Sequence, residues 1–411
     1  MTAILDRAVC PAPIRPLAPV VGADTTVPTT AGGETVYANL DYAASAPALV
    51  SVAERLSGAL TEYASVHRGA GHLSQVTTAR YEQARETVRR FVGGRSDDTV
   101  VFTRNTTDAV NLAAHVTPGD VVVLDIEHHA NLLPWTRTGR ARVVPAARTV
   151  EETVGRLEAE LAAAPAALLA ITGASNVTGE VLPIGRLAAA AHRHGARILV
   201  DAAQLVPHRA VSIASWGIDY LVFSGHKLYA PFGAGALVGR GDWLDAAEPY
   251  LAGGGATADV DLDGRVAWHT GAARHEAGSP NTLGVVALAA AAQALQDIGF
   301  EEIGYHEHRL QQRLDEGLAL LPGVHPLRVF DDAADRVGIA GFTVENHSPR
   351  SVAEYLSVTR GIGVRDGKFC AHPLLRKLGY PDGAVRASFG LGTSSDDVDR
   401  LLAALSDLVR R

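Results

Sequence analysis

Residues 218–227 read IDYLVFSGHK, an apolar run that is followed at once by a serine, a glycine, a histidine and Lys227. The run from Ile218 to Phe223 has the length and the β-branched and aromatic content of a buried strand. A lysine directly after such a strand lies at the carboxyl edge of the sheet, where open α/β sheets bind their ligands. The stretch therefore predicts a sheet and, at its edge, a functional lysine.

A second strand, Ile198 to Val200, ends in Asp201, and Gln204 follows three residues later. A carboxylate at the end of a buried strand is costly unless it is paired. Taken singly, Lys227 could be an exposed loop residue and Asp201 the cap of the next helix. Taken together, at successive strand ends, they favour a pyridoxal phosphate (PLP) site, in which Lys227 binds the cofactor as a Schiff base and Asp201 pairs with the pyridine nitrogen.

A place for the phosphate is indicated by Asn105-Thr106-Thr107, which follow an apolar run at 100–102 and open a helix. Free backbone N–H groups at the helix start and the two threonine hydroxyls would point at one spot. Alone, this pattern is an ordinary helix cap. It gains weight beside Lys227 and Asp201.

Strands and helices alternate along the first half of the chain. Apolar residues at spacings of three and four, Tyr81, Ala84, Val88 and Phe91, predict a helix from about residue 77 that ends at the glycine pair 93–94. The alternation predicts an α/β domain with a mostly parallel sheet covered on both faces. Strands are expected at 100–102, 121–124, 167–171 and 198–200, with helices at 150–163 and 184–194.

After Thr282 the composition shifts to a long alanine-rich helix, 285–295, and a second helical pattern at 301–321. Strand-like runs follow at 324–330 and 339–344, then a helix near 352–358 and a final helix begun by Ser394 or Ser395. This mixture indicates a smaller α+β domain. A length of 411 residues also favours two domains. We expect a flexible, proline-containing segment at 1–34, a large PLP-binding domain at 35–290 and a small C-terminal domain at 291–411.

Composition excludes several classes of protein. The net charge of -8 is spread without basic runs, so nucleic acid is not an expected partner. No run of eighteen apolar residues occurs and the first residues lack a secretory core, so we expect no membrane span and a cytoplasmic location. Two cysteines, Cys10 and Cys370, cannot form a disulfide framework.

Two other kinds of site are also disfavoured. The stretches 127–129 and 192–194 contain paired histidines but no further ligands at a familiar spacing, so we expect no metal. Gly233 and Gly235 are not followed by a third glycine at the spacing of a dinucleotide fingerprint, because the next glycine is at 239. They also precede a strand rather than a helix, so we expect no NAD site.

From Asn39 to its end the chain resembles a class V aminotransferase-fold PLP enzyme, most closely the cysteine desulfurase and selenocysteine lyase group of the sulfur-mobilising type. The matching stretches occur in one order: LDYAASA at 40–46, VHRG at 66–69, EHHAN at 127–131, SNVTG at 175–179, DAAQ at 201–204, SGHK at 224–227, EAGSPNT at 276–282 and RAS at 386–388. The resemblance implies PLP fold type I, with a large and a small domain. It also implies a homodimer with shared active sites.

The resemblance also implies roles for individual residues. Lys227 and Asp201 would hold PLP as described above, while His128 would stack on its ring and move a proton. Asn176 and Gln204 would form hydrogen bonds near the phenolic oxygen and the substrate, and Arg386, assisted by Arg365, would bind the substrate carboxylate. The phosphate would be held by Thr107, Ser224, His226 and, from the second subunit, Thr282, with Thr106 beside Thr107 among the cofactor-binding residues.

Cys370 lies in RDGKFCAHPL, residues 365–374, a glycine-containing stretch rather than a periodic apolar face. Taken alone it could be a structural cysteine, since buried cysteines are common. The resemblance implies that it is the nucleophile that takes sulfur from L-cysteine as a persulfide, releases alanine and serves a sulfur-acceptor protein. Related enzymes usually have a histidine directly before this cysteine, whereas this chain has Lys368 and Phe369.

Other reactions on the same scaffold stay open at this point. An aminotransferase, an amino-acid epimerase or a carbon-sulfur lyase of specialised metabolism would leave Cys370 a bystander. A catalytically silent PLP-binding regulator is a further alternative, against which the lack of an appended DNA-binding domain counts.

Overall fold

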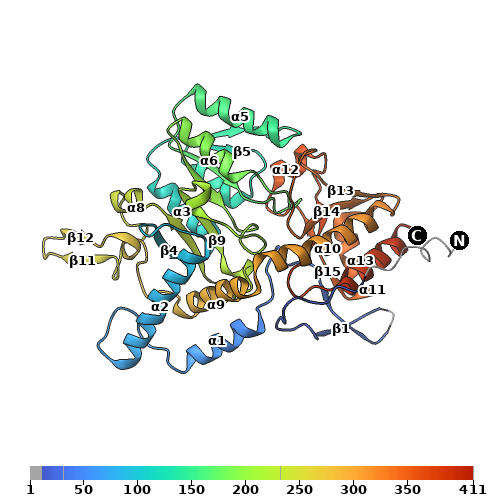
Figure 1. Ribbon diagram of the computed structural model, residues 1–411, viewed down its shortest axis with the longest axis horizontal. Coiled ribbons are helices and arrows are strands. Elements are labelled where there is room, and N and C mark those ends of the chain that lie inside the picture. The colour runs from blue at the N-terminus through green and yellow to red at the C-terminus, as the bar shows by residue number, and fades with distance from the viewer. Residues whose placement is uncertain (1–11, 31, 232, 411) are drawn as a thin grey trace.

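The computed structural model describes residues 12–30, 32–231 and 233–410. Figure 1 shows a larger α/β part and, beside it, a smaller part formed mainly by the C-terminal elements. The predicted fold class is confirmed, because the larger part contains a mostly parallel sheet between helices.

The central sheet has the strand order β4-β10-β9-β8-β7-β5-β6. Strand β10 runs antiparallel to both of its neighbours, whereas the other pairs are parallel. The six strands other than β10 therefore all end at the same edge of the sheet. The bounds are β4 (Thr99–Thr103), β10 (Gly235–Gly239), β9 (Tyr220–Ser224), β8 (Arg197–Asp201), β7 (Leu168–Thr172), β5 (Val121–Leu124) and β6 (Ala141–Val144).

Both faces of the sheet are covered by helices, which explains why its strands read as continuous apolar runs. Along β5, Val121 and Val123 pack into one apolar cluster with Leu112, and Val122 and Leu124 pack into another on the opposite face. The helices of this part are α1 (Val50–Leu60), α2 (His72–Phe91), α3 (Thr106–Val116), α4 (Leu133–Arg137), α5 (Val150–Ala163), α6 (Ile184–Arg193), α7 (Ile213–Trp216), α8 (Asp242–Ala246) and α9 (Thr282–Ile298). The apolar stripe predicted for α2 is buried.

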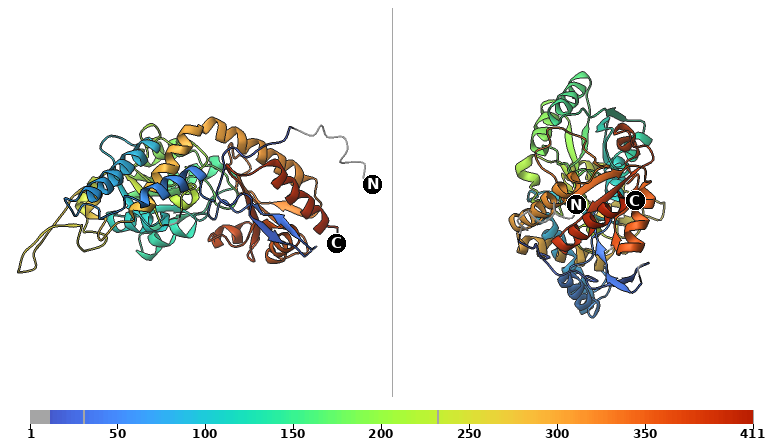
Figure 2. Two further views of the ribbon diagram at one scale, coloured as in Figure 1. Left: turned by 90° about the horizontal axis from the view of Figure 1, so that it is seen from below. Right: turned by 90° about the vertical axis from the view of Figure 1, so that its right-hand side faces the viewer.

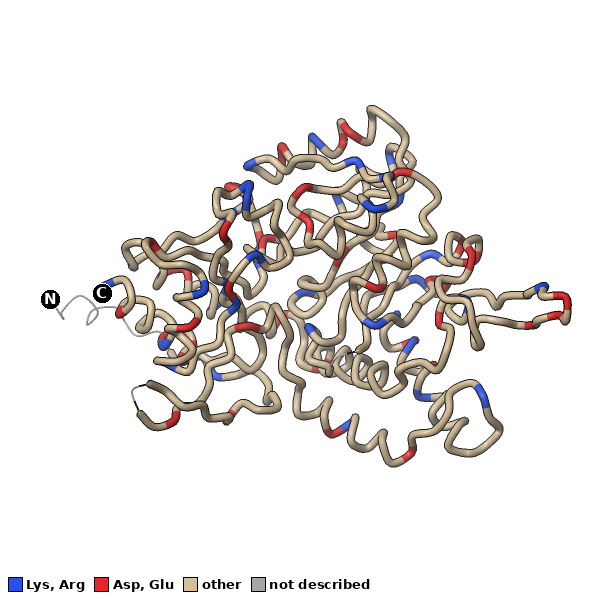
Figure 3. The backbone as a smooth tube through the Cα atoms, turned by 180° about the vertical axis from the view of Figure 1, so that it is seen from behind, with Lys and Arg blue, Asp and Glu red and all other residues tan. Residues whose placement is uncertain are grey.

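A hairpin of β11 (Thr257–Val260) and β12 (Val266–Trp268) extends away from the larger part (Figures 1 and 2). Leu262 at its turn is fully exposed, and acidic residues lie around the turn (Figure 3). A hairpin with no third strand is marginally stable in water. Sequence patterning did not predict it, because strands of four and three residues are too short to give a periodic signal.

The smaller part has an antiparallel sheet in the order β13-β14-β17-β16, packed against helices. Its last helix is capped as expected, since the Ser394 side chain accepts a hydrogen bond from Asp397 N–H. The bounds are β13 (Val324–Pro326), β14 (Ile339–Val344), β16 (Arg365–Gly367), β17 (Ala384–Ser388), α10 (Phe300–Ala319), α11 (Pro349–Arg360), α12 (His372–Lys377) and α13 (Ser395–Leu408).

Two features of the structure bear on the expected domain bounds. Helix α9 is continuous across residue 290 and packs its apolar residues into the core of the larger part, so we propose Gly299, between α9 and α10, as the boundary. Residues 12–30 and 32–34 were expected to be flexible, yet Ile14 is buried in the core of the smaller part. Residues 1–11, including Cys10, lie outside the described residues.

The chain start is attached to the smaller part by backbone pairing as well. Strand β1 (Thr26–Pro28) pairs with β2 (Glu34–Val36), and β3 (Ala38–Asn39) pairs in parallel with β15 (Ile362–Gly363). These elements are too short to give a periodic signal, which is why the sequence did not predict them.

Charged residues of both signs are spread over the molecule (Figure 3). Within the described ranges no single helix is long and apolar enough to cross a membrane; α9 and α10 meet those limits only as a pair, which bends by 82°.

The turn at 175–181 connects the two parts through Glu180, which is 1% exposed. Its carboxylate accepts hydrogen bonds from the backbone N–H groups of Val329 and Phe330, at 2.9 Å and 3.0 Å, and from Thr178 Oγ1. Gly179 precedes it with φ of +76°, and a Cβ there would lie 2.7 Å from Val337 O. The turn therefore needs glycine at 179 and an anionic acceptor at 180.

We expect Glu180→Ala to lower the free energy of unfolding by about 2–4 kcal/mol, because it leaves two buried N–H groups without an acceptor. Urea unfolding followed by circular dichroism would measure the shift. Glu302→Ala, on the exposed side of α10, is the control and should leave the transition unchanged. Equal midpoints for the two variants would contradict this role of Glu180.

Candidate active site

A cavity of about 220 Å³ lies at the sheet edge where β4, β8 and β9 end. Its lining contains most of the residues that were predicted to bind a cofactor, although they come from segments far apart in the chain. These are Thr106, Thr107, His128, Asn176, Asp201, Gln204, Ser224, His226 and Lys227.

Lys227 and Asp201 provide the two charges of the cavity. Lys227 ends the short 3-10 helix Gly225–Lys227 directly after β9, and burial lowers its pKa to about 8 against the opposing effect of the Asp201 carboxylate. Asp201 ends β8, and burial raises its pKa while Ala203 N–H, 3.0 Å from Oδ1, and Lys227 lower it. A neutral lysine amine is therefore accessible near neutral pH.

The start of α3 forms an anion-binding corner. Asn105 caps the helix by accepting a hydrogen bond from Asp108 N–H at 3.0 Å. Ser224 Oγ, from the end of β9, lies 2.7 Å from Thr106 N and 2.6 Å from Thr106 Oγ1. Hydroxyls and the positive end of the helix dipole thus meet at one point, which suits a phosphate group.

His128 follows β5 and faces the cavity as a neutral ring. Burial, and then the charge of Lys227, lower its pKa to about 3. Its Nδ1 accepts a hydrogen bond from Ala130 N–H at 3.0 Å, so the ring proton of the neutral form is on Nε2. A neutral imidazole with a donor at Nε2 can stack on a cofactor ring and donate a proton from one fixed atom.

Glu127 holds the turn that carries His128. It is fully buried, and its carboxyl oxygens accept hydrogen bonds from Thr172 N–H at 3.0 Å and from Asn131 Nδ2 at 2.8 Å. Burial raises the pKa of Glu127 to about 8. Sequence reasoning missed this supporting role, because Thr172 is 45 residues away in the chain.

The two amide side chains of the cavity are held in fixed orientations. Gln204 Nε2 donates to Ala43 O at 2.8 Å, and Asn176 Nδ2 donates to Phe369 O at 2.8 Å. The Ala43 carbonyl lies in the 40–46 stretch, so this early segment takes part in the site.

Arg386 lies on β17 beside the cavity and is 3% exposed. Its Nη1 donates to Asn176 O at 2.9 Å and its Nη2 to Asp41 Oδ1 at 3.0 Å. Among the residues that the structure describes, its buried Nε has no hydrogen-bond partner. A substrate carboxylate would supply the missing acceptor. Asp41 was not predicted, because a buried arginine requires a carboxylate but the sequence does not say which one.

Arg365 and Thr282 do not line the cavity. Arg365 pairs with Arg386 across β16 and β17, but its side chain is exposed and acts only through its charge, which contributes to the lowered pKa of Arg386. Thr282 begins α9, is 5% exposed and has its hydroxyl 3.5 Å from Pro280 O. A single chain therefore does not bring Thr282 to the other predicted phosphate residues.

Cys370 is exposed and lies on a turn with unusual backbone angles. Phe369 and Cys370 have φ of +52° and +53°, a region that residues with a side chain seldom adopt. The turn is held in place because Cys370 O accepts a hydrogen bond from His129 N–H at 2.8 Å. A Cys370 thiolate lies close enough to raise the pKa of Lys227 and of Arg386 by its charge.

His372 is a further histidine near this turn. Its ring lies edge-on to the His129 ring, with centroids 4.5 Å apart, and the backbone N–H of His372 donates to His129 Nε2 at 3.4 Å. Its position two residues after Cys370 is the only sequence signal that could have drawn attention to it.

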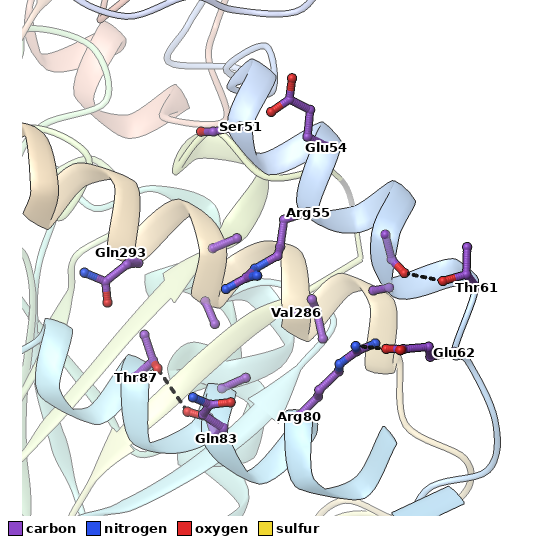
Figure 4. Close-up of a pocket in the computed structure, with 15 residues that line it drawn as sticks. Ser51, Glu54, Arg55, Thr61, Glu62, Arg80, Gln83, Thr87, Val286 and Gln293 are labelled. Atoms are coloured by element: carbon purple, nitrogen blue, oxygen red, sulfur yellow. Dashed lines mark hydrogen bonds and ion pairs between the residues drawn. The ribbon is translucent and has the colours of Figure 1, made fainter. Parts of the chain in front are cut away.

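A second hollow, of about 810 Å³, lies between α1, α2 and α9. Figure 4 shows Arg80 and Glu62 joined as an ion pair there, with Thr61 and Thr87 bonded within their own helical regions. Of the described residues that line it, none is a lysine, histidine or cysteine. It therefore offers none of the predicted chemistry.

The observed residues fit PLP, because an amine and a buried carboxylate face one cavity whose far corner is a helix start with clustered hydroxyls. The fold and the site together define a PLP-dependent enzyme of fold type I. The chain belongs to the aminotransferase class-V family, whose model matches residues 38–401.

Individual relatives agree with this assignment. The chain is 38% identical over 389 residues to a cysteine desulfurase of Klebsiella pneumoniae (strain 342), covering 90% of this chain and 92% of that one. It is 36% identical to a probable cysteine desulfurase of Mycolicibacterium paratuberculosis, of which it spans about half, 51%, with 84% of this chain covered. The apo cysteine desulfurase of Thermococcus onnurineus NA1 has a TM-score of 0.84 at 34% identity, over 91% of this chain and 95% of that one.

The sequence has three lysines, Lys227, Lys368 and Lys377, which allows a direct test of the cofactor site. After incubation with PLP and reduction with borohydride, we expect mass spectrometry to find the tag on Lys227. The yield should rise with pH through about 8, because only the neutral amine reacts with the aldehyde.

Variants give the controls for this experiment. Lys227→Ala should lose the tag, whereas Lys368→Ala and Lys377→Ala should keep it. A tag on either of the other two lysines would contradict the assigned site.

Proposed function

We propose that the chain is a cysteine desulfurase, which converts L-cysteine to L-alanine and receives the sulfur on Cys370 as a persulfide. The observation that carries this proposal is the position of Cys370, on a fixed turn within electrostatic reach of Lys227 and Arg386. The names of the relatives support it.

Substrate binding follows from the residues around Arg386. The guanidinium, held by Asp41 and Asn176, has its Nε left to donate to the substrate carboxylate. This contact would fix the amino acid at one end and leave its amino group toward Lys227.

Proton movement is assigned to Lys227 and His128. Bound PLP supplies an electron-withdrawing ring that weakens the Cα–H bond of the substrate. Lys227, with a pKa of about 8, is an effective base near neutral pH, and its Nζ takes the α-proton. His128 lines the same cavity and can donate a proton from its Nε2–H.

The sulfur step takes place at Cys370. Its thiolate Sγ forms a bond to the substrate sulfur while the Cβ–S bond of the substrate breaks. The electron pair of that bond stays with Cβ of the carbon fragment, which takes up one proton there, and Lys227 returns the α-proton to Cα, so that the fragment leaves as alanine. Because Cys370 is exposed, a sulfur-acceptor protein can reach the persulfide, and we propose such a protein as a partner.

We expect Cys370→Ser to keep its cofactor but to form alanine from L-cysteine at least about 100-fold more slowly, because the nucleophile is lost. Alanine and sulfide are measured together. Cys10→Ser, the matched control, should behave like the wild type. Sulfide release that is untouched in Cys370→Ser would instead indicate a carbon-sulfur lyase.

We also propose that the active form is a homodimer with shared sites. Thr282 does not line the cavity of its own chain, and the β11–β12 hairpin extends into solvent with Leu262 uncovered. A second chain that brings its Thr282 to the phosphate corner and covers the hairpin would account for both.

Mixed dimers test the shared site. Lys227→Ala lacks the amine in every site and Thr282→Val lacks the hydroxyl in every site. In a hybrid dimer, the site that keeps Lys227 receives Thr282 from the other chain, so one of its two sites is restored. Because random pairing makes about half of all dimers hybrids, co-expression should restore about a quarter of all sites. Alanine formation above the mean of the two variants is expected; activity equal to that mean would contradict sharing.

A further inference from the structure

We propose that Phe369 is a positioning residue that couples the carboxylate-binding arginine to the turn that carries the nucleophile. The proposal rests on the proposed function, in that Arg386 is taken to bind the substrate carboxylate and Cys370 to receive sulfur.

Three contacts form a closed cycle. The Phe369 ring lies under the Arg386 guanidinium, with 5.2 Å between Cζ and the ring centroid. Arg386 Nη1 donates to Asn176 O at 2.9 Å, and Asn176 Nδ2 donates back to Phe369 O at 2.8 Å. A displacement of any one of the three residues therefore changes the contacts of the other two.

The cycle also fixes Cys370. Phe369 and Cys370 are both in the left-handed region, a conformation that persists only when surrounding contacts hold it. Phe369 is 7% exposed, and its buried ring and bonded carbonyl anchor one side of the turn, while His129 N–H holds the Cys370 carbonyl on the other. Loss of the ring would release the first anchor.

The contact requires an aromatic face rather than bulk alone. Arg386 is buried, and a ring face is attractive to a desolvated cation because of its quadrupole. Leucine would fill part of the volume without that attraction, whereas tyrosine would keep it. Neutral Phe369 also adds no positive charge beside Arg386, whose pKa is already lowered by burial.

The test measures alkylation of Cys370 by iodoacetamide in the holoenzyme, in a Cys10→Ser background so that Cys370 is the one cysteine left. Propionate is the probe, because it offers a carboxylate without an amine that could react with PLP, and propionamide is its neutral control. We expect propionate to change the alkylation rate in the parent. In Phe369→Leu, the propionate concentration that produces half of this change in alkylation rate should rise by about 2- to 30-fold.

Two further variants separate positioning from general destabilisation. Phe369→Tyr should restore the parent value, and Phe91→Leu, which removes a ring of similar burial from α2, should leave it unchanged. Phe369→Leu should also raise the KM for L-cysteine more than it lowers kcat. An unchanged half-effect concentration in Phe369→Leu, or an equal shift in Phe91→Leu, would overturn the proposal.

The outcome is distinct from that of the function test. If wild-type protein forms no alanine from L-cysteine but propionate still acts on Cys370 through Phe369, the desulfurase assignment fails and the coupling stands. If alanine forms but propionate has the same effect in all variants, the coupling fails and the assignment stands.

Discussion

The structure depends on two opposite charges placed at the ends of neighbouring buried strands. Asp201 ends β8 and Lys227 follows β9, and each charge would be costly to bury alone. The parallel register of these strands fixes their relation, so the apolar runs that form the sheet also set the geometry of the cofactor site. The helix start at Thr106 lies at the same edge because β10, between β4 and β9 in the sheet, is antiparallel to both, so that β4 and β9 run in the same direction.

Those parts of the site that depend on strand ends and short motifs were predictable from the sequence. Lys227, Asp201 and the Asn105-Thr106-Thr107 corner were predicted from local pattern, and the cavity contains them. Partners that depend on distant pairing were not. Asp41 reaches Arg386 across 345 residues, and no periodicity encodes such a contact. Strands such as β1, β11 and β12 were missed because three or four residues are too few to show a period.

The Cys370 turn combines rigidity with exposure. Its backbone is fixed by residues from two other segments, Asn176 and His129, yet its thiol remains open to solvent. In the reaction proposed above, Cys370 would meet a small substrate and then a protein, and neither encounter would have to order the loop first.

The turn at 175–181 has its two ends in different parts of the molecule. Asn176 faces the cavity, while Glu180 is bonded to backbone groups of the smaller part. Any hinge rotation of that part would consequently be transmitted to the Asn176 backbone carbonyl, which accepts a hydrogen bond from Arg386. A substitution at the Glu180 end of the turn could thus be felt at Arg386 without any change to the residues that line the PLP pocket.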